Sequence, residues 1–484
     1  MASRKYRHIS RPPPPKAKKT SGDHALPPKP AEMSWRDYLV MLLHIAAEIE
    51  HGLMVEYLYS AYSLGGLKAS KYDREVHRWR DTILTVAREE MGHLLTVQNV
   101  LCLIGGPVSF ERDDYPWSTP FYPFPFELEP FSLKSIANYT FAEMPSGELE
   151  EKEDRIVKRE VMRYIKDPDA HQVGEIYDRV LEVISDEAKI PDTMFEPETY
   201  KYQATFDDWG RGYRPGPRAP NAPPSEGPPP HERKTRVIVT RVATRTEAIA
   251  ALKDVAGQGE AEYHRSGPKV EPSHFDRFAG IFRELKAITK QEGRGWSPAR
   301  HVPTNPIADA PTHDGGASTS TSITAEPSRT WASLFNIRYR MLLTLLTYAY
   351  RVPRDAPEAV NVRRGPIMAR VFSEMYNLKA IAGILVRLPL RTAKDPARAG
   401  PPFQMPYTLT PPYPESNFWR MQFDLLVTSE ELTAELLHPT KKNLADAPRD
   451  GERYLTSLRD LDRNARTWIE QVLTGLSPSR RFGA

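Results

Sequence analysis

Apolar residues recur at every third or fourth position over several long stretches of the chain, a spacing that is typical of amphipathic helices. The two longest stretches near the start cover residues 34–64 and 73–104, and glycines follow both, as expected at helix ends. The same spacing returns further along the chain. The helices predicted there cover residues 150–165, 174–185, 246–264, 272–290, 331–350, 367–388, 417–437 and 453–476. The pattern predicts an all-α protein.

Segments without this periodicity divide the helices into regions. Residues 1–33 are a basic, proline-rich tail that we expect to be disordered, and residues 307–330 are a low-complexity linker. Residues 107–243 are rich in proline and read as a long insertion. We therefore expect a helical bundle over residues 34–306 that carries this insertion, followed by a C-terminal helical domain over residues 331–484.

Side chains that can bind metal interrupt the apolar stripes of the predicted helices. Glu90 and His93 lie three positions apart, so they face the same side of a helix and can hold one ion. A carboxylate without a partner in an apolar stripe is costly, so burial here indicates a metal or a strong partner. A solvated or salt-bridged helix face is the alternative. The complete candidate set is Glu50, Glu90, His93, Glu260, Glu271 and His274.

Two Glu-x-x-His pairs and two single glutamates are the ligand inventory of ferritin-like bundles, which hold two metal ions between four helices. The order of elements also fits, because two helices precede a long crossover and two follow it. We expect a ferritin-like four-helix bundle with a loop-rich crossover insertion and a C-terminal helical domain. Carboxylate and imidazole ligands favour two iron ions, with manganese as the alternative, and leave positions open for O2 as co-substrate.

Other residues compete for several of these positions. His44, Glu48 and His51 form a neighbouring ridge that could replace Glu50, and Glu56 is a further contender in the same helix. Glu262 and His264 are the fallback for Glu260. Pro272 suits the first position of a helix, so Glu271 could instead be a cap that accepts from backbone amides.

Composition and charge narrow the class of protein. The formal net charge of the 484 residues is only +3, which gives no global field to attract nucleic acid or a membrane. No apolar run reaches 18 residues, and the N-terminus lacks the apolar core of a signal peptide. The single cysteine, Cys102, excludes an internal disulfide and agrees with a reducing compartment. We expect a cytoplasmic protein that binds neither nucleic acid nor membranes.

The insertion contains a dense group of aromatic residues and one short predicted strand, Val237–Val239. The aromatic group can be the small core of an ordered loop or a stacking wall for an aromatic substrate, and the sequence leaves both open. Its members are Tyr115, Trp117, Phe121, Tyr122, Phe124, Phe126, Phe131 and Tyr139.

Five local strings between about Trp35 and Phe403 carry a family resemblance. They are Ala47–His51, Glu89–His93 with Asn99 and Ile104–Gly106, Gly257–Glu260, Glu271–Phe275 with Arg277–Phe278, and Ala399–Phe403. On these the segment resembles the ferritin-like domain of the iminophenyl-pyruvate dimer synthase family. The resemblance implies a role in bisindole pigment pathways such as that of violacein, where two imines made by a partner oxidase are coupled. It also implies metal ligands at the six candidate positions.

Two functions from different classes follow. The first is a non-haem dimetal oxidase or oxygenase that acts on a small, aromatic amino-acid-derived substrate in specialised metabolism, with a partner oxidase and a homodimer as interactions that the resemblance allows. The alternative is a non-catalytic helical scaffold, with or without metal, that recruits partners through its tail and C-terminal domain.

Overall fold

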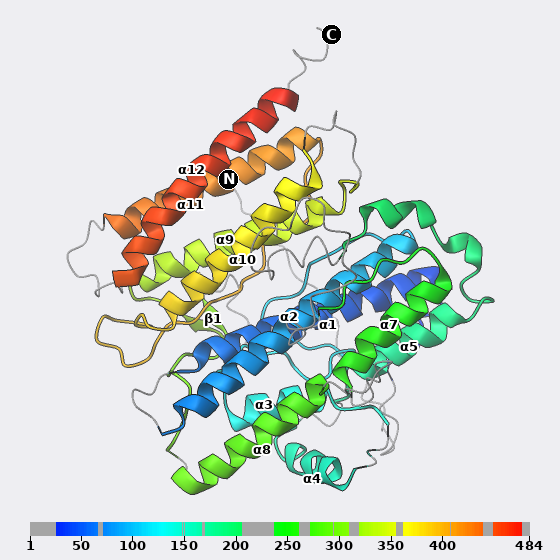
Figure 1. Ribbon diagram of the computed structural model, residues 1–484, viewed down its shortest axis with the longest axis horizontal. Coiled ribbons are helices and arrows are strands. Elements are labelled where there is room, and N and C mark those ends of the chain that lie inside the picture. The colour runs from blue at the N-terminus through cyan, green and yellow to red at the C-terminus, as the bar shows by residue number, and fades with distance from the viewer. Residues whose placement is uncertain are drawn as a thin grey trace, which may run out of the picture.

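The computed structural model describes residues 26–65, 71–147, 149, 151–166, 170–205, 237–260, 272–293, 295–308, 319–354, 362–406, 408–438 and 449–476. Its described part is mostly helical (Figure 1). The longer helices are α1 (Trp35–Ser63), α2 (Asp73–Leu103), α3 (Leu133–Ala142), α4 (Lys152–Val161), α5 (Gly174–Ser185), α7 (Arg245–Gly259), α8 (His274–Glu292), α9 (Ser328–Ala349), α10 (Arg364–Leu385), α11 (Glu415–Leu437) and α12 (Arg449–Leu476). Two short 3₁₀ helices, η1 (Asp192–Met194) and η2 (Pro197–Tyr202), follow α5.

Helices α1 and α2 form the centre of the ferritin-like part. Helix α1 begins after Ser34, whose hydroxyl accepts a hydrogen bond from Asp37 N at 3.0 Å. Helix α2 ends at Leu103, and Gly105 follows with a φ of +62°, a conformation that glycine adopts without strain. The two helices pack along each other and bury most of their apolar side chains. The predicted positions of both helices are confirmed.

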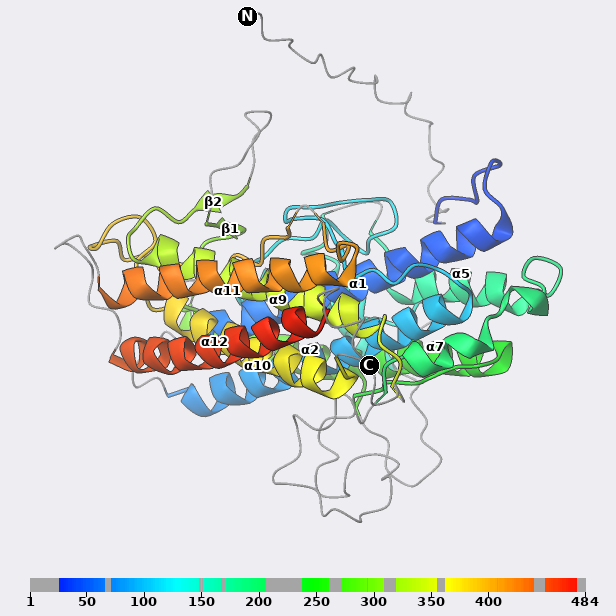
Figure 2. The same ribbon diagram turned by 90° about the horizontal axis from the view of Figure 1, so that it is seen from above.

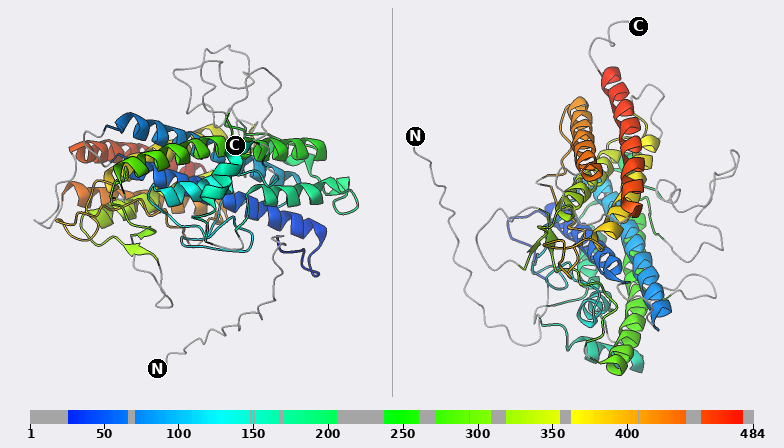
Figure 3. Two further views of the ribbon diagram at one scale, coloured as in Figure 1. Left: turned by 90° about the horizontal axis from the view of Figure 1, so that it is seen from below. Right: turned by 90° about the vertical axis from the view of Figure 1, so that its left-hand side faces the viewer.

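The crossover contributes two helices to the bundle, which the sequence did not lead us to expect. Helices α7 and α8 follow one another along one line in Figures 1 and 3 rather than lying side by side. Helix α5 packs on α7 and on α1, while α3 packs on α8. Two pairs of shorter helices therefore complete the bundle around α1 and α2. Helices α3 and α5 form one pair, and helices α7 and α8 form the other. Helix α4 lies against α3 and α8.

The predicted strand at Val237–Val239 is wrong. These residues have no strand partner, because the backbone of this segment hydrogen-bonds to side chains of α2 instead. Thr96 Oγ1 donates to Ile238 O at 3.2 Å and accepts from Thr240 N at 3.2 Å. The strands in the described residues are β1 (Pro306–Ile307) and β2 (Thr321–Ser322), a parallel pair of two residues each within or beside the predicted linker.

Helices α9 to α12 form a second layer that lies beside the first along the long axis of the molecule (Figure 2). One buried arginine on α9 connects all four helices. Arg338 contacts Glu374 of α10 at 3.2 Å, Ser429 of α11 at 2.5 Å and Asp462 of α12. All these groups are buried away from water, so the positive charge of Arg338 is compensated by the two carboxylates that it contacts.

The two layers share one continuous core. Its buried residues run from Leu26 to Val472, and Cys102 is among them, packed as a small apolar side chain. Helix α1 is long and apolar enough to cross a membrane, but 72% of its apolar window is buried inside the protein, as in the core helix of a soluble protein.

Candidate metal centre

A single carboxylate, Glu90 of α2, lies between two buried imidazoles. Its Oε2 atom lies 2.8 Å from His93 Nδ1, and its Oε1 atom lies 2.8 Å from His274 Nδ1. The two imidazoles stack with their ring centroids 5.4 Å apart. Potential ligand atoms of Glu90, His93 and His274 all lie within 4.8 Å of one another, and each side chain is at most 2% exposed. A carboxylate placed between two imidazoles in this way could be a ligand to two ions.

The far nitrogen of each imidazole is fixed by a neighbouring side chain. His93 Nε2 donates to Gln258 Oε1 of α7 at 2.9 Å. His274 Nε2 donates to Glu89 Oε2 at 3.0 Å, and Glu89 is in turn held by Arg277 Nη1 at 2.5 Å. A histidine that donates from Nε2 presents its Nδ1 lone pair to a metal, so these partners orient both rings as ligands.

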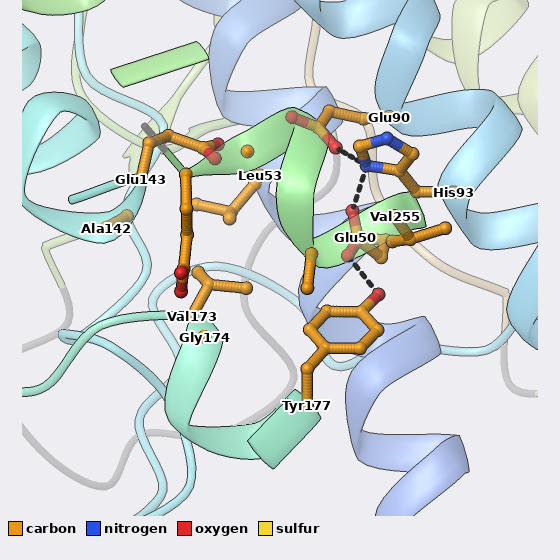
Figure 4. A pocket seen from close by; sticks show the side chains of 13 residues that line it. Glu50, Leu53, Glu90, His93, Ala142, Glu143, Val173, Gly174, Tyr177 and Val255 are labelled. Carbon is orange, nitrogen blue, oxygen red and sulfur yellow. Dashed lines mark hydrogen bonds and ion pairs between the residues drawn. The ribbon is translucent and has the colours of Figure 1, made fainter. Parts of the chain in front are cut away.

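Two further carboxylates reach the cluster, each held by a tyrosine hydroxyl. Glu50 of α1 lies 3.5 Å from His93 Nδ1 and accepts a hydrogen bond from Tyr177 of α5. Glu143, which caps the C-terminal end of α3, lies 3.6 Å from His274 Nδ1 and accepts from Tyr57 at 2.5 Å. Figure 4 shows Tyr177, Glu50, His93 and Glu90 joined in one continuous chain of contacts. The arrangement is close to two-fold, with one histidine and one terminal carboxylate on each side of Glu90.

Electrostatics of the cluster favour the binding of cations. Burial and the nearby Glu90 charge raise the pKa of Glu50 to about 7. Burial alone would lower the pKa of His93, but the Glu90 and Glu50 carboxylates outweigh it and raise the pKa to about 10. Burial also lowers the pKa of His274, but the neighbouring carboxylates, above all Glu90, outweigh it and raise this pKa well above its ordinary value. Protons therefore occupy the sites where metal ions would bind, and metal binding would release them.

The donor set fits a pair of metal ions. His274 Nδ1 and Glu90 Oε1 are buried and lie 2.8 Å apart as an ion pair, and neither has a partner with hydrogen-bond geometry among the described residues. Such buried polar atoms without a hydrogen bond are costly, and a shared ion removes the cost. Mixed carboxylate and imidazole ligands suit iron and manganese.

Glu260 lies at the edge of the cluster. The structure ends α7 at Gly259 and makes Glu260 its C-terminal cap, so the prediction that Glu260 lies within a helix reaching residue 264 is wrong at this end. The small residues Gly257 and Gly259 weaken the helix here. Glu260 still lines the cavity beside Glu50, Glu90 and Glu143. Glu262 and His264 lie outside the described residues.

Glu271 also lies outside the described residues. The prediction that it caps α8, with Pro272 at the first helical position, is wrong because Ser273 is the cap. Ser273 Oγ accepts from Asp276 N at 3.1 Å, and Asp276 Oδ2 accepts from Ser273 N at 3.0 Å. Helix α8 therefore begins at His274 and places this ligand at its first turn.

The four alternatives on α1 lie away from the cluster and bind other groups. His44 Nε2 contacts Pro107 O at 2.8 Å, and Glu48 Oε1 accepts from Asp113 N at 3.1 Å. His51 Nε2 contacts the Tyr339 hydroxyl at 2.5 Å, and Glu56 Oε1 accepts from Glu127 N at 2.8 Å. These contacts join α1 to the crossover and to α9, so the hypothesis that one of the four replaces Glu50 is wrong.

The cavity beside the cluster has about 320 Å3 of empty volume, part of it open to solvent. Its walls come from α1, α2, the end of α3, the start of α5 and the end of α7. None of the crossover aromatics named from the sequence lines it; Tyr122 stacks on Phe126, and Phe131 on Trp79, within the core. The lining residues are Glu50, Leu53, Glu90, His93, Ala142, Glu143, Val173, Gly174, Tyr177, Val255, Ala256, Gly259 and Glu260.

Known proteins share the part of the chain that builds this cluster. A family model described as Ferritin-like matches residues 43–283, which include every residue placed in the cluster above. This part of the chain is a ferritin-like domain. The predicted ferritin-like fold class is thereby confirmed. The resemblance to the bisindole-pathway family is confirmed by the relative described next.

One relative of the ferritin-like domain extends the comparison. The chain is 25% identical over 411 residues to dichlorochromopyrrolate synthase of Lentzea aerocolonigenes, which covers 77% of this chain and 36% of the relative. The chain thus spans about a third of that relative's length. A solved structure of a ferritin-like protein from Caulobacter vibrioides is 16% identical with a TM-score of 0.37, covering 71% of this chain and 94% of that one.

The sequence did not point to two residues of the cluster, Glu143 and Tyr177. Glu143 ends a ten-residue helix in a segment that we expected to be irregular. A signal for that helix exists, because Ser132 and Ser135 form a capping box directly before an apolar run. Tyr177 lies on the correctly predicted helix α5, but nothing in its spacing ties that helix to α1.

Proposed function

We propose that this protein is a non-haem dimetal oxidase or oxygenase of specialised metabolism, with iron as the favoured metal and O2 as co-substrate. The observation that carries the proposal is the Glu90 carboxylate, whose two oxygens each lie 2.8 Å from the Nδ1 atom of a different histidine. A bound pair of metal ions would supply the redox chemistry and the binding of O2. Glu50, Glu90, His93, Glu143 and His274 would hold it, with Glu260 as the further carboxylate of the cavity.

The residues around the cluster would keep this chemistry in place. Gln258 and Glu89 fix the orientation of the two imidazoles, and Arg277 balances the charge of Glu89. Tyr177 and Tyr57 hold the terminal carboxylates by their hydroxyl groups. In the described part of the chain the residues of the cluster are mostly buried and one side of it borders the cavity, which limits the access of water.

The proposed substrate is small, aromatic and derived from an amino acid. Support comes from the Lentzea relative, whose name describes the synthesis of a dichlorinated chromopyrrolate. A partner oxidase would supply such a substrate as an imine. Incubation of the iron-loaded protein with an aromatic amino acid and its oxidase should yield a coupled pyrrole product, and absence of coupling would remove this substrate while leaving the general oxidase proposal.

Oxygen uptake tests the proposed reaction class. The iron-loaded protein, reduced without air, should consume O2 rapidly on mixing, and His274→Ala should consume it at least about tenfold more slowly because one ligand is lost. The exposed His77, on the first turns of α2, provides a matched control as His77→Ala. Iron-loaded protein that does not react with O2 would favour a structural metal site and would overturn the enzyme proposal.

A further inference from the structure

Helix α5 comes from the crossover, yet two of its residues face the cavity beside the metal cluster. Gly174 and Tyr177 both line the cavity, and their spacing of three places them on one face of the helix. The start of α5 is tied to the end of α3, because Val173 N donates to Ala142 O at 2.9 Å. The same helix packs on α1 and α7, which carry Glu50 and Glu260.

Gly174 makes room for one carboxylate. A Cβ atom added at this position would lie 1.7 Å from Oε1 of Glu260 and 2.9 Å from its Cδ. Glu260 is anchored at its backbone, where its N–H donates to Ala256 O at 3.0 Å, so the side chain would have to leave its present place. The carboxylate also lies at the N-terminal end of α5, where the helix dipole favours negative charge.

Tyr177 holds a second carboxylate from the same face of α5. Its hydroxyl donates to Oε1 of Glu50, and both side chains are fully buried or nearly so. Glu50 Oε2 lies 3.5 Å from His93 Nδ1, so a change at Tyr177 would reach the imidazole through one carboxylate. Figure 4 shows the Tyr177 ring rising from α5 toward Glu50.

We propose that α5 positions two carboxylates of the metal centre, with Gly174 setting the place of Glu260 and Tyr177 setting the place of Glu50 beside His93. The His274 side of the centre takes its carboxylate from α3 and its hydroxyl from Tyr57 of α1. The Tyr177 hydroxyl thus acts on the carboxylate beside His93 and the Tyr57 hydroxyl on the carboxylate beside His274, so loss of the Tyr177 hydroxyl should weaken the binding of one ion and spare the other. This inference rests on the dimetal site of the proposed function.

Titration of the metal-free full chain with Mn2+, followed by electron paramagnetic resonance, tests this division. The unchanged protein should bind two Mn2+ and show the spectrum of an exchange-coupled pair. Tyr177→Phe should lower the affinity for one of the two ions by about 10-fold to 100-fold and leave the six-line spectrum of an isolated ion, and Gly174→Ala should lower metal affinity by a similar factor.

Matched controls separate this effect from a general one. Tyr376→Phe changes a tyrosine that is 59% exposed on α10, and Gly280→Ala changes a glycine of α8 with no atom within 4 Å of an added Cβ. Both controls should retain the coupled pair. Thermal unfolding of each variant shows whether it folds; if Gly174→Ala does not, Tyr177→Phe decides, because its ring still fills the same space.

Each outcome of the titration has one meaning. Two ions bound with unchanged affinity in Tyr177→Phe would overturn the role of α5 while leaving the proposed function intact. Loss of both ions together in Tyr177→Phe would also overturn it, because the Tyr177 hydroxyl would then not act on one side of the centre. An unchanged protein that binds no Mn2+ would overturn the proposed function and this inference with it.

Discussion

Glu90 Oε1 lies 2.8 Å from His274 Nδ1, and this contact joins residues that are 184 positions apart in the sequence. It brings the middle of α2 next to the first residue of α8. Among the described residues neither atom has a partner with hydrogen-bond geometry, so the contact is an ion pair. A buried pair of this kind can take up an ion between its two atoms, as proposed above, and the expectations below follow from that proposal and from the packing around the pair.

Glu89 should affect metal affinity although it is not itself a proposed ligand, because it accepts a hydrogen bond from the proposed ligand His274. Glu89→Gln weakens its hold on both His274 and Arg277, so we expect metal affinity to fall by about 10-fold to 100-fold. Competition with a metal chelator measures the change. Glu284→Gln is the control, because Glu284 also pairs with an arginine of α2, Arg78, at 2.5 Å but outside the cluster. Equal affinities in the two variants would show that Glu89 does not orient His274.

Arg338 should be the most sensitive charged residue of the C-terminal layer. Arg338→Ala leaves Glu374 and Asp462 buried without their partner, so the free energy of unfolding should fall by about 3–5 kcal/mol. Arg466→Ala removes a more exposed pair with Glu430 and should cost about 0–1 kcal/mol. Urea unfolding of both variants gives the comparison, and similar losses would contradict the buried-network interpretation.

Two glycine positions should respond in opposite directions to alanine. At Gly92 of α2 an added Cβ would lie 2.4 Å from the backbone oxygen of Ile238, so Gly92→Ala should destabilise the protein by about 1–3 kcal/mol. At Gly280 of α8 there is open space, and Gly280→Ala should stabilise it by about 0.5–1 kcal/mol through helix propensity. Thermal or urea unfolding distinguishes the two; a stable Gly92→Ala variant would show that the 237–240 segment does not pack there.

Glu56 should make stability depend on pH. Burial raises the pKa of Glu56 well above its ordinary value of 4.5, with the Glu127 amide opposing the shift. The unfolded chain therefore loses this proton at lower pH than the folded chain does. As pH rises above about 4.5, this group therefore lowers the free energy of unfolding by up to about 1.4 kcal/mol per pH unit. The decrease ends at the pH where Glu56 ionises in the folded protein.

Glu56→Gln removes this contribution and keeps an oxygen that can accept from Glu127 N. The stability that it gains over the unchanged protein should be small at pH 5 and larger at pH 8, as measured by urea unfolding. Glu452→Gln, at an exposed position of α12, provides the control. A gain that stays constant from pH 5 to pH 8 would mean that Glu56 is ionised in the folded protein.

Much of the fold could be predicted from the sequence because long helices repeat their apolar pattern many times. The stripes of α1 and α2 extend over about eight turns each, so single exceptions do not hide them. The ten residues of α3 give fewer than three turns, and the proline-rich segment before them suggested a loop. Helix α3 was missed for this reason, whereas α5 was predicted as a helix but its packing on α1 and α7 was not.

The site was predictable where spacing along one helix determines it. Glu90 and His93 share a face of α2 by their spacing alone, and the structure brings both into the cluster with Glu50 and His274. Glu143 was not predictable in this way, because only the packing of α3 on α8 brings it within 3.6 Å of His274. Helical periodicity records which residues share a face, but not which faces meet.

Elemental analysis of the purified protein, after expression with sufficient iron and manganese, tests the central claim most directly. We predict two metal ions per chain in the unchanged protein, fewer than one in Glu90→Ala, and still two in Glu48→Ala, whose side chain lies outside the cluster. Less than one ion in the unchanged protein, or an unchanged metal content in Glu90→Ala, would contradict the assignment of Glu90 as the carboxylate shared by two ions.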